Sequence, residues 1–261
     1  MIVIYVLDIH LPKLKYEHFS MHKNPKMIKS NLIKKYNTVN KMEYLKNIYK
    51  NYPVIIFSCG PTSNIDFNNF KKIQNKYVII AVKYISKTLI HHGINVDFII
   101  CSDWYQNQGQ IRHHPDIPIV NVHNTYNKNN YSNNNYDLNI YPLNNQTHTQ
   151  TFEKIKNSQN IDDILYTSDK IKKNGIYPYL GHIMLEVAIP LAVFIGCTEI
   201  HTLGWDLDYH TYFDGSKVLF KSDCSETLYV KDIYTMFKKN GINIYKSDIK
   251  SPIMLPYKRL M

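Results

Sequence analysis

The chain has 261 residues, of which 44% are hydrophobic and 20% charged, so it is long enough and apolar enough for one α/β domain with a sizeable core. No apolar run reaches the roughly 18–20 residues of a membrane helix, and no basic residue precedes the apolar start. We therefore expect a cytoplasmic protein with neither a transmembrane segment nor a secretory signal.

The net charge of +10 is concentrated near the N-terminus, because residues 1–50 hold ten lysines against three acidic residues. Arg112 and Arg259 are the only arginines, although arginine is the residue that nucleic-acid readers use for bidentate base contacts. The charge therefore predicts a basic N-terminal appendage, residues 1–52, and no specific nucleic-acid partner. The excess of Lys, Asn and Tyr is typical of an AT-rich genome.

From residue 53 onward, short apolar runs alternate with helical patterns. The runs do not alternate polar with apolar residues, which indicates strands buried on both faces of a parallel sheet. Expected strands are 54–58, 78–82, 97–101, 117–122, 164–167, 200–203 and 242–245; expected helices are 66–75, 84–92, 183–196 and 226–240. Residues 126–147, with nine Asn, predict a long loop or insertion. The pattern favours a single Rossmann-like, doubly wound α/β domain with a mainly parallel sheet, residues 53–261.

A turn of small residues follows the first expected strand. Small residues at the carboxyl end of such a strand let backbone N–H groups approach a phosphate or nucleotide. The turn residues expected to bind the nucleotide are Ser58, Cys59, Gly60, Pro61 and Thr62. Ser63 and Asp66 are candidates to cap the next helix. The alternative is an ordinary strand–helix turn, since the segment is neither a GxGxxG motif nor a P-loop.

A long apolar helix predicts a second element of the site. Gly181 and His182 open this helix, Pro190 predicts a kink within it, and Gly196 is an expected stop signal. The amino end of a buried helix favours an anion. The strand that follows ends at Gly204, Trp205 and Asp206, where open α/β sheets bind ligands.

A loop rich in reactive side chains comes next: Asp206, Asp208, Tyr209, His210 and Tyr212. The two carboxylates are candidate ligands for Mg²⁺ or Mn²⁺, His210 is a candidate general base, and the tyrosine hydroxyls are candidate donors to a leaving phosphate. The alternative is a polar loop in which the carboxylates stabilise turns.

Residues after two other strands are candidates for the pocket wall. Lys83 follows the strand at 78–82, whereas Ser102 and Asp103 follow the strand at 97–101. The cysteines show no CxxC spacing, which favours buried free thiols over a zinc or redox site.

Three segments together carry a family resemblance: VIIFSCGPTSN at 54–64, the strands at 78–83 and 97–103, and GHIMLEVAIPLAVFIGCTEIHTLGWD at 181–206. In order and spacing they resemble the bacterial sialyltransferases of glycosyltransferase family 42. They equally resemble the 6-hydroxymethylpterin diphosphokinase MptE-like proteins, which include flagellin-glycosylation factors. The resemblance covers roughly residues 53–256.

The resemblance implies a nucleotide-activated sugar donor, a cytidine monophosphate sugar in the sialyltransferases, and a glycan or lipid acceptor. Gly60, Pro61 and Thr62 match the family's first turn, and Cys59 replaces its asparagine. Lys83 and Ser102 stand near the positions where the family carries further asparagines. Tyr209 and Tyr212 fall close to the tyrosines that hold the leaving phosphate, and His210 matches the histidine of the MptE-like relatives. The alternatives are a pterin diphosphokinase-like phosphotransferase and a non-catalytic nucleotide-binding protein, either of them compatible with a homo-oligomer.

Overall fold

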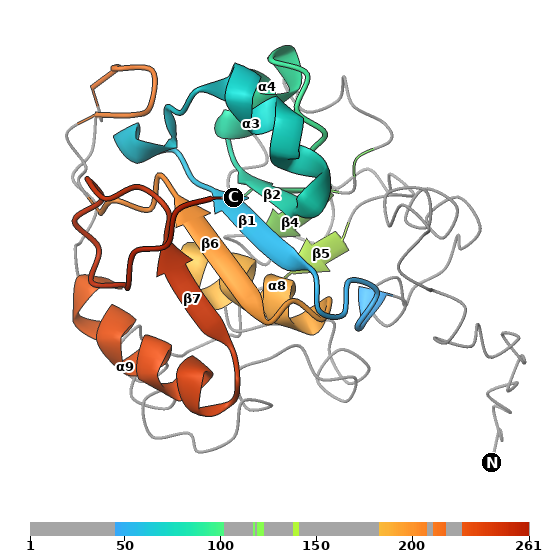
Figure 1. Cartoon of the computed structure of the whole chain (residues 1–261), viewed down its shortest axis with the longest axis vertical. Coiled ribbons are helices and arrows are strands. Elements are labelled where there is room, and N and C mark those ends of the chain that lie inside the picture. The colour runs from blue at the N-terminus through green and yellow to red at the C-terminus, as the bar shows by residue number, and fades with distance from the viewer. Residues whose placement is uncertain are drawn as a thin grey trace, which may run out of the picture. The chain divides into compact units, whose positions relative to one another are not determined.

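A computed structural model describes residues 45–101, 117, 119–122, 138–140, 183–207, 211–217 and 226–260. In this part of the chain, seven strands pair in parallel as one sheet of order β5-β4-β3-β2-β1-β6-β7 (Figure 1). The strands are β1 (Pro53–Phe57), β2 (Val78–Val82), β3 (Phe98–Cys101), β4 (Ile119–Val122), β5 (Leu138–Ile140), β6 (Glu199–Leu203) and β7 (Asn243–Lys246).

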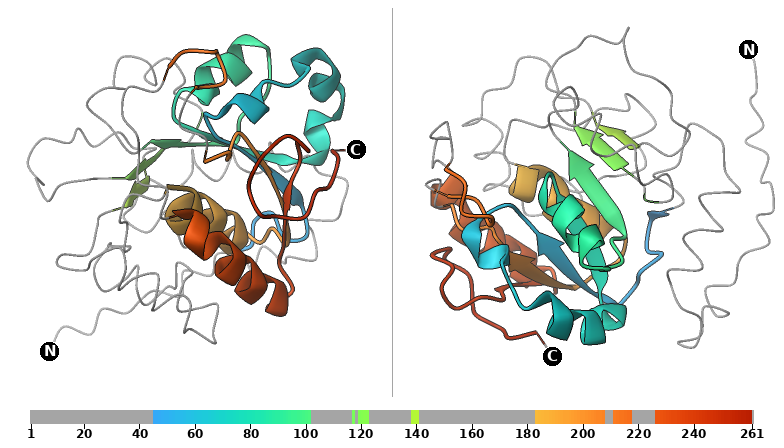
Figure 2. Two further views of the ribbon diagram at one scale, coloured as in Figure 1. Left: turned by 90° about the vertical axis from the view of Figure 1, so that its left-hand side faces the viewer. Right: turned by 90° about the horizontal axis from the view of Figure 1, so that it is seen from above.

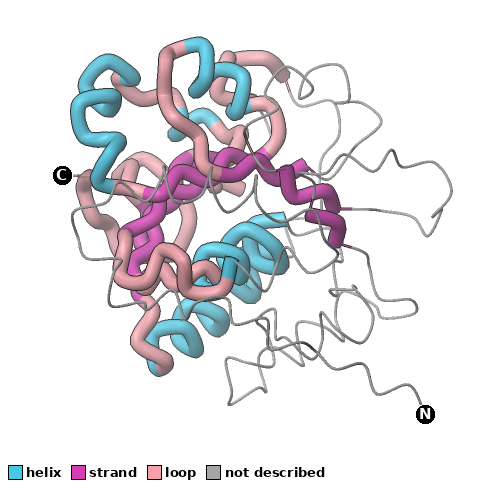
Figure 3. Tube along the Cα trace, turned by 90° about the vertical axis from the view of Figure 1, so that its right-hand side faces the viewer, coloured by secondary structure: helices cyan, strands magenta, loops and turns pink. Residues whose placement is uncertain are grey.

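Helices cover both faces of this sheet, as Figures 2 and 3 show. One face carries α3 (Phe67–Ile73), the 3₁₀ turn η3 (Gln74–Lys76) and α4 (Ile85–His91), whereas the other carries η6 (Met184–Ala188), α8 (Ile189–Phe194) and α9 (Glu226–Lys239). Alternate residues of β1 divide between two cores: Val54 and Ile56 pack with α8 and α9, and Ile55 and Phe57 pack with α3 and α4. The predicted doubly wound α/β fold with a parallel sheet is therefore confirmed.

The strand order reverses between β1 and β6. From β1 the chain adds β2, β3, β4 and β5 on one side, and it then returns to place β6 and β7 on the other. The carboxyl ends of the two adjacent strands thus flank the switch point, the position where open α/β sheets bind their ligands.

The predicted helix at 183–196 contains two kinds of turn. Met184–Ala188 forms a π-helical segment, in which the Ile189 N–H donates to the Met184 carbonyl, and α8 follows directly. Pro190 lies in the first turn of α8 and has no N–H to donate to the carbonyl four residues earlier. The π-helical turn therefore stands where the regular hydrogen bonds of the α-helix are interrupted. Gly196 follows the helix at φ +101°, as expected of a stop signal.

Two further expectations need correction. Leu138–Ile140 lies inside the segment expected to be a loop, but it pairs with β4 as an edge strand. Three residues with two aliphatic side chains form a strand here because β4 supplies the backbone hydrogen bonds. Asp66, and not Ser63, caps α3 by accepting from the Asn69 N–H at 3.1 Å, whereas the Ser63 hydroxyl donates to the Gly60 carbonyl at 2.8 Å. The strand expected at 164–167 lies outside the described residues.

The segment 45–52 packs against the end of α8. Backbone N–H groups of Asn47, Tyr49 and Asn51 donate to the carbonyls of residues 194, 195 and 196 at 3.0, 2.8 and 3.1 Å. They satisfy carbonyls that a helix end leaves without intrahelical partners. Leu45 and Tyr49 are buried in the core beneath α8 and α9. The appendage boundary at residue 52 stays a prediction, and the structure adds that residues 45–52 contribute to the core.

Within the described part of the chain, no helix has the length and apolar character needed to cross a membrane.

Candidate functional site

The turns after β1 and β6 lie against each other at the switch point. The β1–β6 ladder continues past the strands, with Ser58 N donating to Leu203 O at 2.8 Å and Gly60 N to Gly204 O at 2.9 Å. A Cβ at Gly60 would lie 2.5 Å from an Asp206 carboxylate oxygen, and a Cβ at Gly204 would lie 2.4 Å from the Ser58 carbonyl oxygen. Gly204 also has φ +69°, so both close approach and backbone conformation require glycine there.

Thr62 and Asp206 clamp the two turns together. The Thr62 N–H donates to Asp206 Oδ2 at 2.8 Å, and the Thr62 hydroxyl donates to Asp206 Oδ1. The same hydroxyl accepts from the Gly204 N–H at 3.0 Å. Asp206 is only 2% exposed, so these contacts compensate a carboxylate that has lost most of its water. Its first role is thus to hold the site's shape.

Five backbone N–H groups of the first turn donate to protein acceptors. Those of Ser58, Gly60 and Thr62 bond to the β6 side, whereas those of Ser63 and Asn64 bond to the carbonyls of residues 60 and 61. These five groups are therefore not free to donate to a phosphate, and nucleotide binding by the turn stays a prediction. The small residues of the turn form a wall that these bonds hold in place.

Cys59 links this wall to the next strand. Its thiol donates to the Val82 carbonyl at 3.2 Å, and burial raises the pKa of the thiol, so it is neutral at physiological pH and poorly suited as a nucleophile. Lys83 follows β2 in the left-handed region at φ 58°, and its N–H donates to Ile100 O at 2.7 Å. The expected free buried thiols are confirmed for Cys59, Cys101 and Cys197.

The loop at 211–217 lies beside the first turn. Its ends meet in an antiparallel bridge between Thr211 and Lys217, and the Phe213 N–H donates to the Cys59 carbonyl at 2.9 Å. Tyr212 is half-buried and packs on the core beneath α3 and α4. The loop is closed by the Ser216 hydroxyl, which donates to Asp214 and lowers the pKa of that carboxylate.

The structure brings together these predicted residues at the ends of β1, β2 and β6: Ser58, Cys59, Gly60, Pro61, Thr62, Lys83, Gly204 and Asp206. Tyr212 lies in the loop 211–217 beside them. Outside the described residues lie Ser102, Asp103, Gly181, His182, Asp208, Tyr209 and His210. Among the residues that are described, no three His, Cys, Asp or Glu side chains gather as metal ligands. Of the expected metal pair, the described carboxylate, Asp206, is held by Thr62.

Sequence reasoning missed a second polar cluster on β6. His201 is 1% exposed and contacts Glu199 and Ser247, and Glu199 in turn pairs with Lys258. The available signal is a pair of titratable residues two positions apart in a strand, which places them on one face of the sheet.

Comparison with known proteins gives three findings. A family model described as 6-hydroxymethylpterin diphosphokinase MptE-like matches residues 30–211. No curated protein sequence matches the chain. Among solved structures, the MAf glycosyltransferase of Magnetospirillum magneticum AMB-1 is similar at 14% identity and a TM-score of 0.47, over 81% of this chain and 34% of that one. The chain thus spans about a third of that protein's length.

Proposed function

The chain belongs to the 6-hydroxymethylpterin diphosphokinase MptE-like family, and from this premise we propose that it is a glycosyltransferase-like enzyme that takes a nucleotide-activated sugar as donor. The observation that carries the proposal is the position of the clamped turns. Residues 58–62 and 204–206 flank the one place where the strand order reverses. A crevice at that place is where α/β sheets bind nucleotides.

Different segments are proposed to bind different parts of the donor. The small residues of the two turns are proposed to form the wall on which the base or sugar lies, and Gly60 and Gly204 let the two turns approach each other closely. Since five N–H groups of the turn are occupied, the donor's phosphate is proposed to lie on the amino end of the helix that Gly181 and His182 open. Tyr209 and Tyr212 are proposed to donate to the phosphate as it leaves. Tyr212 belongs to a loop whose backbone bonds to Cys59, at the wall itself.

For the reaction, His210 is proposed to accept the proton of the acceptor hydroxyl as that oxygen attacks the anomeric carbon. The bond between this carbon and the donor phosphate breaks, and the nucleotide leaves with the electron pair. Stabilising the charge on that phosphate is the main catalytic demand. A form that depends on Mg²⁺ or Mn²⁺ would use Asp208 together with an Asp206 oxygen that already accepts from Thr62.

A second candidate function follows from the family's own description. A diphosphokinase would transfer a diphosphoryl group from ATP to a hydroxymethylpterin, and it would require a divalent metal to neutralise the phosphates. The same switch point would hold the ATP, so fold alone does not choose between the two reactions.

Ligand preference separates these functions. We expect a cytidine or uridine diphosphate or monophosphate sugar to raise the melting temperature of the full chain, with the shift unchanged by EDTA. A shift that needs ATP, Mg²⁺ and the pterin together would favour the diphosphokinase. If none of the cytidine, uridine, guanosine and adenosine sugar nucleotides nor ATP changes the melting temperature, the proposed donor class is wrong.

A further inference from the structure

Large apolar side chains are exposed on the segment that follows β7, which we call the C-terminal loop, residues 247–260. In the described part of the chain, four large hydrophobic residues are exposed, and three of them belong to this loop: Ile249 at 70%, Met254 at 72% and Tyr257 at 46%. The fourth is Tyr84, directly before α4, at 37%. Single exposed apolar residues are ordinary on a protein surface, but three within so short a segment form a cluster.

Two of these side chains lie at the tips of tight turns. Ile249 is at a corner of the four-residue turn 248–251, which a backbone hydrogen bond of 3.2 Å closes. Met254 is the central residue of the three-residue turn 253–255, closed by a backbone hydrogen bond of 2.9 Å. Turn corners usually carry Gly, Asn, Asp or Ser. Long aliphatic side chains at both tips depart from this preference, and such departures concentrate at functional sites.

The backbone beneath the two tips is fixed to the domain. Ile253 and Leu255, on either side of the second tip, are buried in the core that contains α8 and α9. Lys246 Nζ donates to the Ser251 carbonyl at 2.7 Å, at the end of the first turn. The exposed side chains therefore cannot fold back onto the core without breaking these contacts.

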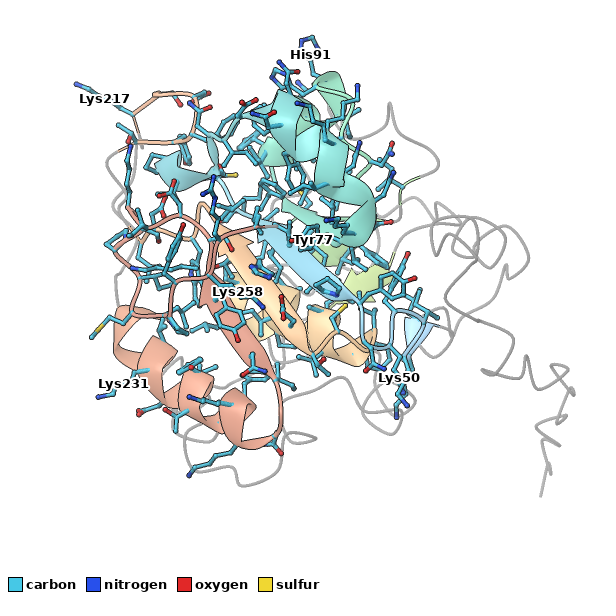
Figure 4. All side chains as sticks on the ribbon, in the orientation of Figure 1. Lys50, Tyr77, His91, Lys217, Lys231 and Lys258 are labelled. Atoms are coloured by element: carbon cyan, nitrogen blue, oxygen red, sulfur yellow. The ribbon has the colours of Figure 1, made fainter. Side chains whose placement is uncertain are left out.

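The C-terminal loop is also basic, with three basic residues against one acidic residue. Lys250 and Arg259 are exposed, the first of them next to a turn tip. Asp248 accepts from the backbone N–H of Lys250 at 2.7 Å. Lys258 pairs with Glu199 at 2.8 Å and lies over β6 and β7 in Figure 4. Two exposed cations thus accompany the exposed apolar side chains, and this charge fits an anionic partner.

The loop lies at the edge of the sheet that holds the candidate site. In Figure 1 it leaves the tip of the β7 arrow, beside the tips of β6 and β1. The Ser251 hydroxyl lies 3.5 Å from the carbonyl of Trp205, the residue before Asp206. A surface bound by the loop would therefore face the carboxyl ends of the strands.

We propose that the C-terminal loop docks this protein on an anionic lipid bilayer. Ile249 and Met254 enter the layer between the headgroups, Tyr257 lies at the interface, and Lys250 and Arg259 contact the lipid phosphates. Aliphatic, aromatic and basic side chains in this combination are typical of proteins that bind the surface of a membrane. The inference does not depend on the proposed function, because it requires neither a donor nor a reaction.

A bilayer fits these tips better than a folded partner does. The tips are five residues apart, which is at most about 18 Å of chain, and they stand on two separate turns instead of lining one groove. A fluid lipid surface needs no complementary shape. A second copy of the chain would bring together two loops of the same positive sign, each on a molecule of net charge +10.

Sedimentation of the full chain with vesicles of equal parts phosphatidylserine and phosphatidylcholine tests the proposal. Other basic residues of the chain also attract anionic lipid, so the decisive variant keeps the charge. Ile249→Ser combined with Met254→Ser should weaken vesicle binding at least roughly tenfold, because two apolar side chains no longer leave water. Tyr84→Ser, at the exposed apolar position outside the loop, is the matched control and should bind as wild type.

A charge variant tests the contact with the headgroups. Lys250→Gln should weaken vesicle binding about fivefold, which is the contribution of one lysine near an anionic surface. Lys87→Gln removes the same charge from an exposed position of α4 and should leave binding nearly unchanged. Equal losses in the two variants would contradict docking through the loop.

A further measurement uses the wild-type chain alone. In anionic bicelles that contain a nitroxide-labelled lipid, the methyl NMR signal of Met254 should broaden, whereas that of Met236, buried on α9, should not. The proposal is overturned if the signal of Met254 stays sharp, or if the wild-type chain does not sediment with the vesicles. It is equally overturned if the double serine variant binds as tightly as wild type, since charge alone then attracts the chain. A double serine variant that separates a dimer while vesicle binding is unchanged would assign the loop to a contact between copies instead.

Discussion

Thr62 gives both its backbone N–H and its hydroxyl to the carboxylate of Asp206, which lies 144 residues further along the chain. This pair joins the turn after β1 to the turn after β6, at the point where the strand order reverses. Asp206 therefore acts first on the shape of the site, and variants of Thr62 can measure that role without changing the carboxylate.

Thr62→Val should lower the free energy of unfolding by about 1.5–3 kcal/mol. The change keeps the side-chain shape but leaves the buried Asp206 carboxylate and the Gly204 N–H without the hydroxyl. Thr62→Ser retains the hydroxyl and is the matched control, with a loss of about 1 kcal/mol or less. Urea denaturation measures both variants, and equal losses in the two would show that the hydroxyl contributes little.

Gly204→Ala should destabilise the chain by about 1–3 kcal/mol more than Gly215→Ala. Both glycines have positive φ, +69° and +80°, so alanine at either position bears a similar conformational cost. They differ in space, because a Cβ at Gly204 meets the Ser58 carbonyl whereas a Cβ at Gly215 meets nothing within 4 Å. Thermal denaturation of the two variants measures the cost of the steric contact at position 204. Equal melting temperatures would contradict this prediction.

Tyr49→Phe should leave the chain unchanged in stability or raise it by about 1 kcal/mol. The Tyr49 hydroxyl is buried and has no hydrogen-bond partner among the described residues, and burial raises its pKa. Phenylalanine keeps the edge-to-face contacts of the ring with Tyr52 and Phe98 while removing that unpaired group. Urea denaturation measures Tyr49→Phe together with Tyr52→Phe as a control. A clear loss of stability in Tyr49→Phe would show that the Tyr49 hydroxyl has a hydrogen-bond partner, which contradicts the prediction.

Removing residues 1–51 should destabilise the domain far more than removing residues 1–37. The longer deletion takes away Leu45 and Tyr49 from the core and three N–H donors from the end of α8, whereas the shorter one leaves the unit 38–261 whole. Removal of two buried side chains of this size costs about 4–10 kcal/mol. Thermal melts followed by circular dichroism compare the two truncated chains. Identical melting temperatures would show that residues 38–51 do not contribute to the stability of the domain.

His210→Ala should lower turnover by about 10²–10⁴-fold with donor affinity nearly unchanged, if this histidine is the proposed general base. Its reference pKa of about 6.5 suits proton transfer near neutral pH. His91→Ala, at an exposed position of α4, is the control and should retain full activity. The assay is transfer from whichever sugar nucleotide the ligand screen identifies. Full turnover in His210→Ala would remove this residue from the mechanism.

The sequence predicted the strands that are buried on both faces of the sheet. Runs such as Val54–Phe57 and Val78–Val82 are unbroken by polar residues, and each became a strand within a residue of its expected bounds. Leu138–Ile140 escaped prediction because its surroundings are nearly all polar and its pairing depends on β4 alone. Local pattern carries no information on a partner that distant residues supply.

The site could be predicted as a place but not as a set of contacts. Periodicity puts Thr62 and Asp206 at strand ends, and the topology makes those ends neighbours. That Ser58 and Gly60 donate their N–H groups to the β6 side follows only from the register, since Pro53 pairs with Glu199 and the ladder then runs on to Gly60 and Gly204. Register depends on a strand that is distant in the sequence, so the residues of one strand alone do not reveal it.

The pairing of Tyr257 with Lys246 has a consequence for how the chain behaves in solution. β7 is the last strand on its side of the described sheet, and without residues 247–260 its outer row of N–H and C=O groups would be open to a strand from another molecule. The last residues therefore serve as a guard against self-association. Proteolysis that removes these residues would expose the edge of β7, so aggregation is the failure to expect from a chain that has lost its C-terminus.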